Sequence, residues 1–179
     1  MVRQLAGAVV ILAVALSGTG CEDGSAATEG ATSATTTTPH VRQGAPVTVG
    51  NLRVTVDDHF VLREIGEPDR LFRYHKPRGI WFVVVMEVEN ASNGPQHFDG
   101  AYCHLLVDGR EYQSDTSASE DISGDTRAST FLNPGFSQKV VVAFDVPEGI
   151  FPPKQRPVQV EVKPQIDADP VLVTLTSGD

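Results

Sequence analysis

The feature that most constrains the fold is a two-residue alternation of apolar and polar side chains, repeated in short runs between turn signals. It is clearest in residues 52–56 and 158–162, where every second side chain is Leu or Val. A period of two is typical of a half-buried β-strand. The first run continues past a bulge that we expect at Asp57 and Asp58. No stretch between the turns shows a sustained helical period, so the sequence predicts an all-β fold.

The strongest predicted strand covers residues 80–90. One face of it carries only apolar side chains, namely Phe82, Val84, Met86 and Val88. The other face begins with Trp81 and Val83 and becomes polar at Glu87 and Glu89. Apolar residues on both faces are typical of a central strand that is covered on both sides. We therefore expect a central strand whose first half is buried on both faces.

Turn signals divide the remaining strands. Asp108 and Gly109 predict a type I′ hairpin turn, because both of its central positions need positive φ. Pro134 and Gly135 suit a type II turn. Residues 114–128 are polar and aperiodic and are predicted to form a long loop. The pattern as a whole predicts an immunoglobulin-like antiparallel β-sandwich of about seven to eight strands, without the paired cysteines of antibody domains.

The N-terminal residues 1–20 have the order of a secretory signal. Arg3 precedes an apolar run at residues 5–16, and small residues follow up to Cys21. The apolar run is too short to cross the ~30 Å core of a bilayer as a permanent helix. We therefore expect a removable export signal.

Cys21 is the expected lipid attachment residue. The residues before it resemble a bacterial lipobox, in which the cysteine becomes the new N-terminus and carries a diacylglyceryl group; Gly18 stands where a larger aliphatic residue is usual. The alternative is ordinary cleavage that leaves Cys21 as a free thiol. Residues 21–44 are rich in Ser, Thr and Ala and are expected to form a disordered linker, either bare or O-glycosylated. The folded domain is predicted at residues 45–179.

The charge and the cysteine count exclude some classes of function and of fold. The chain has 14 basic and 23 acidic residues and a net charge of −9, which disfavours binding to nucleic acid. Its two cysteines are Cys21 and Cys103, so a disulfide-stapled domain is not expected. Cys103 and His104 are strand neighbours that point to opposite faces, and we expect Cys103 to be a buried, inert thiol. No nucleophile elbow is present, and we predict no catalytic residues, no cofactor and no enzyme activity.

We expect no metal site, but the sequence leaves two candidate sites open. The histidines lack ligand spacing; they are His40, His59, His75, His97 and His104. His97 and His104 could nevertheless meet across a sheet. The loop at residues 115–125 could offer calcium the oxygens of Asp115, Glu120, Asp121 and Asp125, although a solvated acidic loop is the default.

A basic run is unusual in this acidic chain. It consists of Arg63, Arg70, Arg73, Lys76 and Arg78. Such a run could face anionic headgroups or an acidic polymer of the cell envelope. The default interpretation is a solvated surface, with the cations interleaved with acidic residues.

Four segments carry a resemblance to a known family: residues 81–90, 105–112, 132–135 and 141–149. Together they resemble the immunoglobulin-like domain of unknown function in lipoproteins of Gram-positive and actinobacterial cells. That domain is often labelled after a telomeric repeat-binding factor, and a secreted mycobacterial immunogenic protein has a similar sandwich. The resemblance spans about residues 45–176. It implies the fold and the location, and it brings no site residues with it.

The expected function follows from these features. We predict an exported protein that is lipid-anchored on the outer face of the cytoplasmic membrane. Its sandwich is expected to act as a binding module for a protein or polymer of the envelope. The alternatives are a carrier of a small ligand or a metal ion such as calcium, and, with the least support, an envelope enzyme.

Overall fold

The computed structural model describes residues 38–67, 73–122, 127–150 and 157–176. The predicted signal peptide, Cys21 and most of the predicted linker lie outside these residues. Strand β1 (His40–Arg42) begins inside the stretch 21–44 that the sequence assigned to the linker. Three residues with one partly buried apolar side chain, Val41, are too few to show a period.

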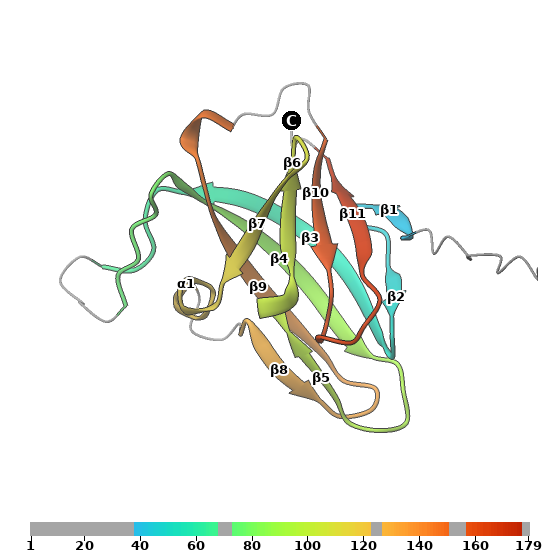
Figure 1. Ribbon diagram of the computed structural model, residues 1–179. Coiled ribbons are helices and arrows are strands. Elements are labelled where there is room, and N and C mark those ends of the chain that lie inside the picture. The colour runs from blue at the N-terminus through green and yellow to red at the C-terminus, as the bar shows by residue number, and fades with distance from the viewer. Residues whose placement is uncertain (1–37, 68–72, 123–126, 151–156, 177–179) are drawn as a thin grey trace, which may run out of the picture. The chain divides into compact units, whose positions relative to one another are not determined.

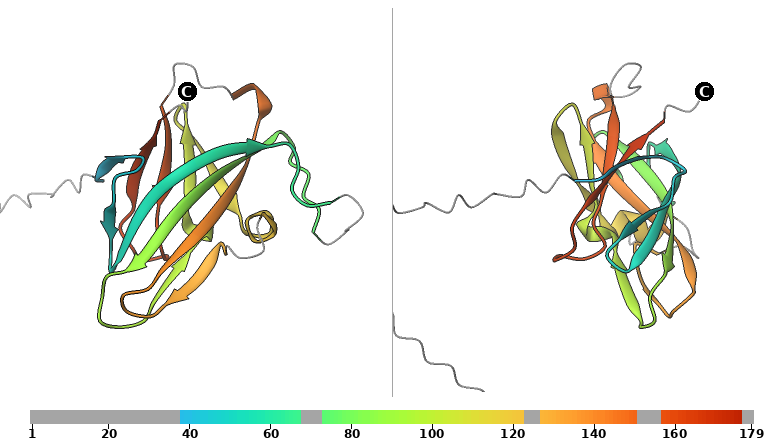
Figure 2. Two further views of the ribbon diagram at one scale, coloured as in Figure 1. Left: turned by 180° about the vertical axis from the view of Figure 1, so that it is seen from behind. Right: turned by 90° about the vertical axis from the view of Figure 1, so that its right-hand side faces the viewer.

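The strands form two layers (Figures 1 and 2). The first sheet contains β1, β11 (Val171–Leu175), β10 (Val158–Val162), β6 (His104–Val107) and the start of β7 (Arg110–Asp115). The second sheet contains the end of β7, then β9 (Ser137–Val146), β4 (Ile80–Asn90), β3 (Leu52–Leu62) and β2 (Val47–Val49). The predicted all-β sandwich is confirmed.

Backbone hydrogen bonds join the two sheets along both sides. Strand β7 pairs with β6 over most of its length and then with β9 at Ser114 and Asp115. On the other side, Gln43 N donates to Thr174 O of the first sheet at 2.9 Å, and Gly44 N donates to Val56 O of the second at 2.8 Å. The chain between β1 and β2 therefore crosses from one layer to the other.

A short ribbon of β5 (Gln96–Asp99) and β8 (Ser129–Leu132) lies at one end of the sandwich (Figure 1). With these strands the described residues contain eleven, more than the seven to eight expected. Two 3₁₀ turns, η1 (Gly100–Tyr102) and η2 (Glu148–Ile150), complete the connections. The sequence pattern does not reveal β8, because Phe131 and Leu132 are adjacent apolar residues. Only Leu132 is buried, whereas Phe131 is exposed.

The main core lies between the sheets. Its side chains come from the predicted inward positions, including Val54, Met86, Leu105, Phe144 and Val160, all fully buried. Burying each such side chain contributes roughly 1.5–3 kcal/mol. The alternation read from the sequence therefore assigns the core-facing side of these strands correctly.

Strand β4 is central, as predicted, between β3 and β9. A second, smaller core covers the first half of its outer face and includes Trp81 and Val83, with Ala118 and Val141 packed against them. Beyond this cover, the outer face of β4 is exposed at Glu87 and partly exposed at Glu89.

The predicted turns and the bulge are confirmed. Asp108 and Gly109 have φ values of 53° and 71°. Gly135 has φ 76°, and Phe136 N closes the turn on Asn133 O at 3.1 Å. The register of β3 against β4 shifts between Val56 and Asp58.

The prediction of a structureless loop at residues 114–128 was wrong. Helix α1 (Thr116–Asp121) begins there, capped by Asp115, whose carboxylate accepts from Ala118 N at 2.9 Å. Buried Ser119 accepts from Ala143 N at 2.8 Å, which ties the helix to β9. A helix of six residues is too short to show an apolar period.

Candidate functional site

The outer face of the second sheet is divided into a covered half and an open half. Helix α1 and Ile65, from the connection between β3 and β4, cover the apolar half. His75 in the same connection meets Asp121 of α1 at 2.8 Å, and Trp81 Nε1 donates to His75 O at 3.1 Å. No such cover lies over the polar half among the described residues, so this half presents side chains to solvent.

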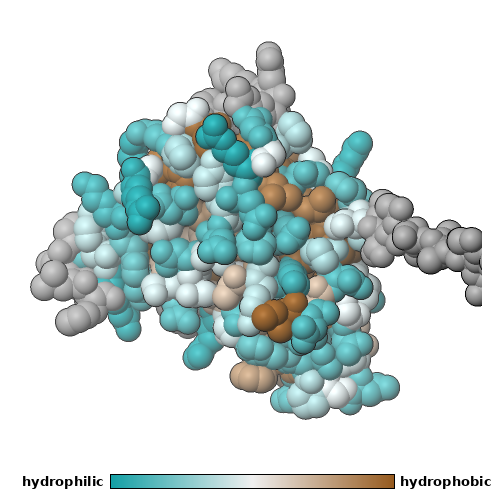
Figure 3. Space-filling view, in the orientation of Figure 1, coloured by the Kyte–Doolittle hydropathy of each residue, from teal (hydrophilic) through white to brown (hydrophobic). Residues whose placement is uncertain are grey.

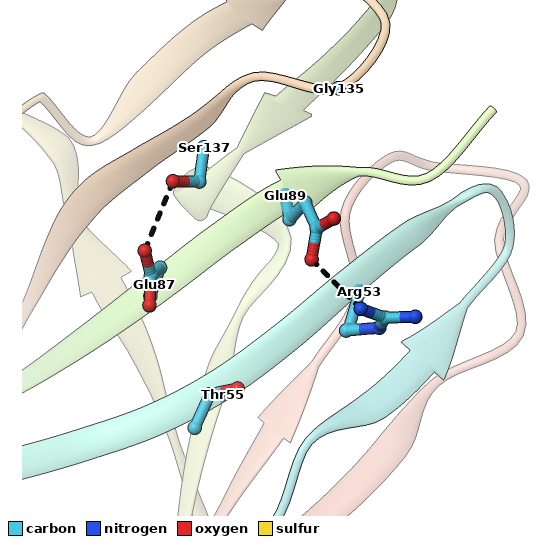
Figure 4. Close-up of a pocket in the computed structure, with 6 residues that line it drawn as sticks. All are labelled: Arg53, Thr55, Glu87, Glu89, Gly135 and Ser137. Atoms are coloured by element: carbon cyan, nitrogen blue, oxygen red, sulfur yellow. Dashed lines mark hydrogen bonds and ion pairs between the residues drawn. The ribbon is translucent and has the colours of Figure 1, made fainter. Parts of the chain in front are cut away.

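A hollow of about 180 Å³ lies on this open half (Figure 4). Its lining comes from β3, β4, the turn before β9 and the start of β9; the residues are Arg53, Thr55, Glu87, Glu89, Gly135 and Ser137. We call this feature the sheet hollow. Because all five side chains are polar, it is a candidate site for a hydrogen-bonding ligand.

The sheet register brings these residues together. Arg53 lies opposite Glu89, and Thr55 lies opposite Glu87, on the two central strands. Glu89 in turn lies opposite Ser137 of β9. Alternate residues of a strand point to the same face, so all of these side chains emerge outward.

Two polar contacts order the hollow. Arg53 Nη1 donates to Glu89 Oε2 at 3.1 Å, and Ser137 Oγ donates to Glu87 Oε1 at 3.0 Å. Figure 4 shows both contacts on the same open face of the sheet. The ion pair is largely exposed, so it contributes little to the stability of the fold.

The structure places Cys103 where the sequence predicted. Its side chain is fully buried in the main core. Burial raises the pKa of the Cys103 thiol to about 12. The thiolate is therefore absent at neutral pH, and Cys103 is unsuited to nucleophilic catalysis.

The histidine pair suggested by the sequence is not formed. His97 lies in the β5–β8 ribbon and His104 in the first sheet. His104 Nδ1 is 3.2 Å from Glu161 Oε1, and its Nε2 is 3.6 Å from Glu111 Oε1. The two carboxylates contact different nitrogens of the His104 ring, so they do not converge on one point.

The face that carries β6, β7, β10 and β11 is largely hydrophilic (Figure 3).

The acidic residues suggested as calcium ligands have other roles where they are described. Asp115 caps helix α1 and Asp121 contacts His75, while Glu120 is exposed. Asp125 lies outside the described residues. Within the part of the chain that the structure describes, no three His, Cys, Asp or Glu side chains gather where they could hold a metal ion.

The described cations of the basic run are exposed; they are Arg63, Arg73, Lys76 and Arg78. Arg63 pairs with Glu148 at 2.8 Å on an exposed surface. Arg78 uses its backbone N–H, which donates to Asp145. Arg70 lies outside the described residues. These contacts agree with the solvated interpretation of this run.

One hydroxyl–imidazole pair was not foreseen. His97 Nε2 is 2.9 Å from Ser129 Oγ, and the His97 ring packs on Phe131 with centroids 4.3 Å apart. Hydrolases use such pairs, but they also need a group that orients the imidazole. No hydrogen bond to His97 Nδ1 is seen among the described residues. The sequence could not indicate the pair, because the two residues meet only through the β5–β8 register.

The fold defines a β-sandwich protein, and the sheet hollow lies on a polar part of its second sheet that no other described element covers. Residues 41–166 match the family described as a domain of unknown function, DUF4352, and the chain belongs to this family. A comparison with curated proteins finds no match. Among the described residues, no helix has the length and apolar character needed to cross a membrane.

Solved structures share the fold at low identity. The yjhA protein from Bacillus subtilis is 13% identical, with a TM-score of 0.54 over 76% of this chain and 99% of that one. A conserved hypothetical protein from Bacillus anthracis is 19% identical, with a TM-score of 0.53 over 73% and 94%. A "putative lipoprotein (ycdA)" from Bacillus subtilis is 11% identical, with a TM-score of 0.54 over 76% and 39%.

These comparisons confirm part of the family prediction. A domain of unknown function with a β-sandwich fold is confirmed. The relation to immunoglobulin-like domains and to the telomeric label stays a prediction, as does the lipoprotein character of this chain.

Proposed function

We propose that this chain is an exported, lipid-anchored protein of the cell envelope whose sandwich is a binding module. The observation that carries the proposal is the position of Cys21, directly after an apolar run and four small residues. The similarity in fold to a protein described as a putative lipoprotein agrees with this location.

The anchor is tested by metabolic labelling with an alkyne fatty acid in a Gram-positive host. The wild-type protein is expected to be labelled and to sediment with membranes. The diacylglyceryl group on Cys21 would supply two acyl chains, and stable anchoring needs more than one. Cys21→Ala is expected to lose the label and to leave the membrane fraction. Cys103→Ala is the matched control and should be labelled like the wild type. Equal labelling of Cys21→Ala would refute the anchor.

The binding role is supported by the sheet hollow. A polar face with ordered side chains and no covering element is available to a partner, whereas the described residues offer no complete catalytic set. The test is crosslinking in intact cells, followed by capture of the anchored protein. A binding module is expected to give discrete adducts that Glu87→Ala reduces and Glu111→Ala, on the other sheet, leaves unchanged. Absence of any adduct would contradict the proposal.

A small ligand is a second possible occupant, favoured by the size of the hollow. Calcium is not proposed, since Asp115 and Asp121 have other partners.

A further inference from the structure

We propose that one end of the sandwich docks on the surface of the lipid bilayer through two exposed phenylalanines, Phe131 and Phe136. They stand at the two ends of the turn between β8 and β9, and we call residues 131–136 the aromatic tip. This inference rests on the proposed function, because the Cys21 anchor brings the domain to the bilayer. It goes further, since it gives the anchored domain an orientation.

The two rings are presented to solvent. Phe131 is 80% exposed and Phe136 is 65% exposed, more than any other large apolar side chain of the described residues. Leu132 is buried in the main core, so Phe131, its neighbour on β8, points away from the core. By the same alternation Phe136 points away from the face of Ser137 and from the sheet hollow. Single exposed apolar residues are common, but two aromatic rings on one turn form a contact surface.

The tip carries no charge. Residues 90–98, which hold the turn between β4 and β5 and the first part of β5, contain no Asp, Glu, Lys or Arg, and neither do residues 128–138, which hold β8 and the tip. The whole chain has a net charge of −9. An uncharged aromatic surface can enter the headgroup region of a bilayer without desolvating a charge. The tip is therefore suited to a lipid surface.

Hydrogen bonds hold the tip in one shape. Asn90, at the end of β4, donates from its side chain to Leu132 O at 2.8 Å. Its backbone N–H donates to Phe136 O at 2.9 Å, and its backbone oxygen accepts from Gly135 N at 2.9 Å. Because the rings stand on a turn that is already fixed, little conformational freedom is lost on docking, and more of the apolar contact energy is retained.

The chain from the anchor enters the domain at the same end of the sandwich. Leu172 N, at the start of β11, donates to Pro39 O at 3.0 Å. The loop just before β11 is bonded to the β5–β8 ribbon, since Asp99 N donates to Pro164 O at 2.9 Å. Residues 22–37, between Cys21 and the described domain, span at most about 58 Å. The anchor therefore keeps the tip near the bilayer, and docking becomes an intramolecular step.

The basic run would give the opposite orientation. It belongs to the connection that precedes Ile80, whereas the tip lies beside Asn90, at the other end of β4 (Figure 1). The 11 residues of β4 separate the two surfaces by about 35 Å. A basic surface needs anionic lipid and is weakened by salt. Apolar contact by the tip needs no anionic lipid and is not weakened by salt.

The charges around the tip predict its lipid preference. Glu89 lies next to Asn90, and exposed Asp167 and Asp169 lie in the loop that contacts β5. Anionic headgroups repel these carboxylates. The tip is therefore expected to dock more tightly on vesicles of phosphatidylcholine than on vesicles that also contain phosphatidylglycerol.

The test is hydroxyl-radical footprinting read by mass spectrometry. The full-length protein is coupled through the Cys21 thiol to a maleimide lipid in phosphatidylcholine vesicles, and buried Cys103 does not compete. The reference is the Cys21→Ala protein in buffer without vesicles. Phe131 and Phe136 are expected to be oxidised at least about threefold less on vesicles, at low and at high salt.

Variants locate the contact. On vesicles, Phe131→Ser is expected to raise the oxidation of Phe136 towards its level in buffer, and Phe136→Ser that of Phe131, because docking then rests on one ring. Val61→Ser is the matched control: Val61 is an apolar side chain, 51% exposed, near the far end of β3, and both rings should stay protected in this variant. All three positions are exposed, so melting temperatures should stay close to that of the wild type. Protection that survives both phenylalanine substitutions overturns the location.

Two other results overturn the proposal. Protection around Arg63 and Lys76 with both phenylalanines unprotected would assign the bilayer contact to the basic run. Protection of the phenylalanines that rises with protein concentration in buffer, without vesicles, would make the tip a contact between two copies of the chain.

This test and that of the proposed function can fail separately, because the chemical coupling replaces acylation in the cell. If Cys21 is labelled in cells but the coupled protein shows no protection at Phe131 and Phe136, docking is wrong and the anchored binding module stands. If Cys21→Ala is labelled like the wild type but the coupled protein shows the protection, the anchor is wrong and the affinity of the tip for lipid stands.

Discussion

The side-chain amide of Asn90 donates to the carbonyl oxygen of Leu132 at 2.8 Å, across 42 residues of sequence. The same nitrogen donates to Gly94 O at 2.8 Å, and its Oδ1 accepts from Ser92 N at 2.9 Å. Asn90 is fully buried. One side chain therefore joins the end of β4 to the end of β8, next to the turn that supplies Gly135 to the sheet hollow.

Asn90→Ala is expected to destabilise the protein by about 2–4 kcal/mol, because it removes the buried hydrogen bond to Leu132 O and the part-buried bonds to Gly94 O and Ser92 N. Urea unfolding followed by Trp81 fluorescence measures the change. Asn93→Ala, in the same turn but exposed, is the control and should cost less than about 0.5 kcal/mol. Equal effects of the two substitutions would show that the Asn90 bonds contribute nothing specific.

Cys103 is expected to resist thiol reagents in the native state. Its thiol is fully buried and its pKa is raised to about 12, so access and thiolate are both lacking. With Cys21→Ala as the background, a disulfide reagent at pH 8 should react only after denaturant is added. Rapid reaction of the native protein would mean that the core around Cys103 opens.

The sequence predicts those parts of the fold that depend on near neighbours. The two faces of β4 follow from alternation, and the turn at Asp108 and Gly109 follows from the φ values it needs. The burial of Cys103 follows from the apolar residues that share its face, Leu105 and Val107. Each of these rests on residues only a few positions apart.

The sheet hollow could not be predicted in the same way. Arg53 and Glu89 are 36 residues apart, and they meet only because the register of β3 on β4 is fixed, including the shift at Val56 and Asp58. A one-residue slip would send these side chains to the other face. Helix α1 was missed for a related reason, because Ser119 is anchored by Ala143, a residue of a distant strand.

His59 makes the stability depend on pH. Its ring stacks on Phe82 with centroids 5.3 Å apart, and Nδ1 lies 3.1 Å from Gln43 Oε1. Partial burial lowers the pKa of His59 below 6.5, against the smaller opposing effect of the Asp58 carboxylate. The unfolded chain therefore takes up a proton at this histidine before the folded chain does. Stability from His59 is complete above pH 6.5 and is lost as the pH falls through the lowered pKa.

The expected outcome is that the melting temperature of the wild type falls between pH 7.5 and 5.5, and that His59→Gln reduces this fall. Melting curves at several pH values, read as the difference between variant and wild type, isolate the contribution of His59. His40→Gln replaces an exposed histidine and should follow the wild type. A steeper fall in His59→Gln would reverse the sign of the argument.

Gly79 is required by a close approach of two backbones. A Cβ at this position would overlap Val146 O and crowd the backbone of Pro147, neither of which is the flexible end of a side chain. Gly79→Ala must therefore push β4 away from the end of β9, and a loss of about 1–3 kcal/mol is expected. Gly94→Ala is the matched control, because a Cβ there would meet nothing within 4 Å and its φ is not positive. The control is expected to be neutral or slightly stabilising, since alanine restricts the unfolded chain. Urea unfolding of both variants decides the matter, and a Gly79→Ala protein as stable as Gly94→Ala would show that the two backbones can separate there without cost.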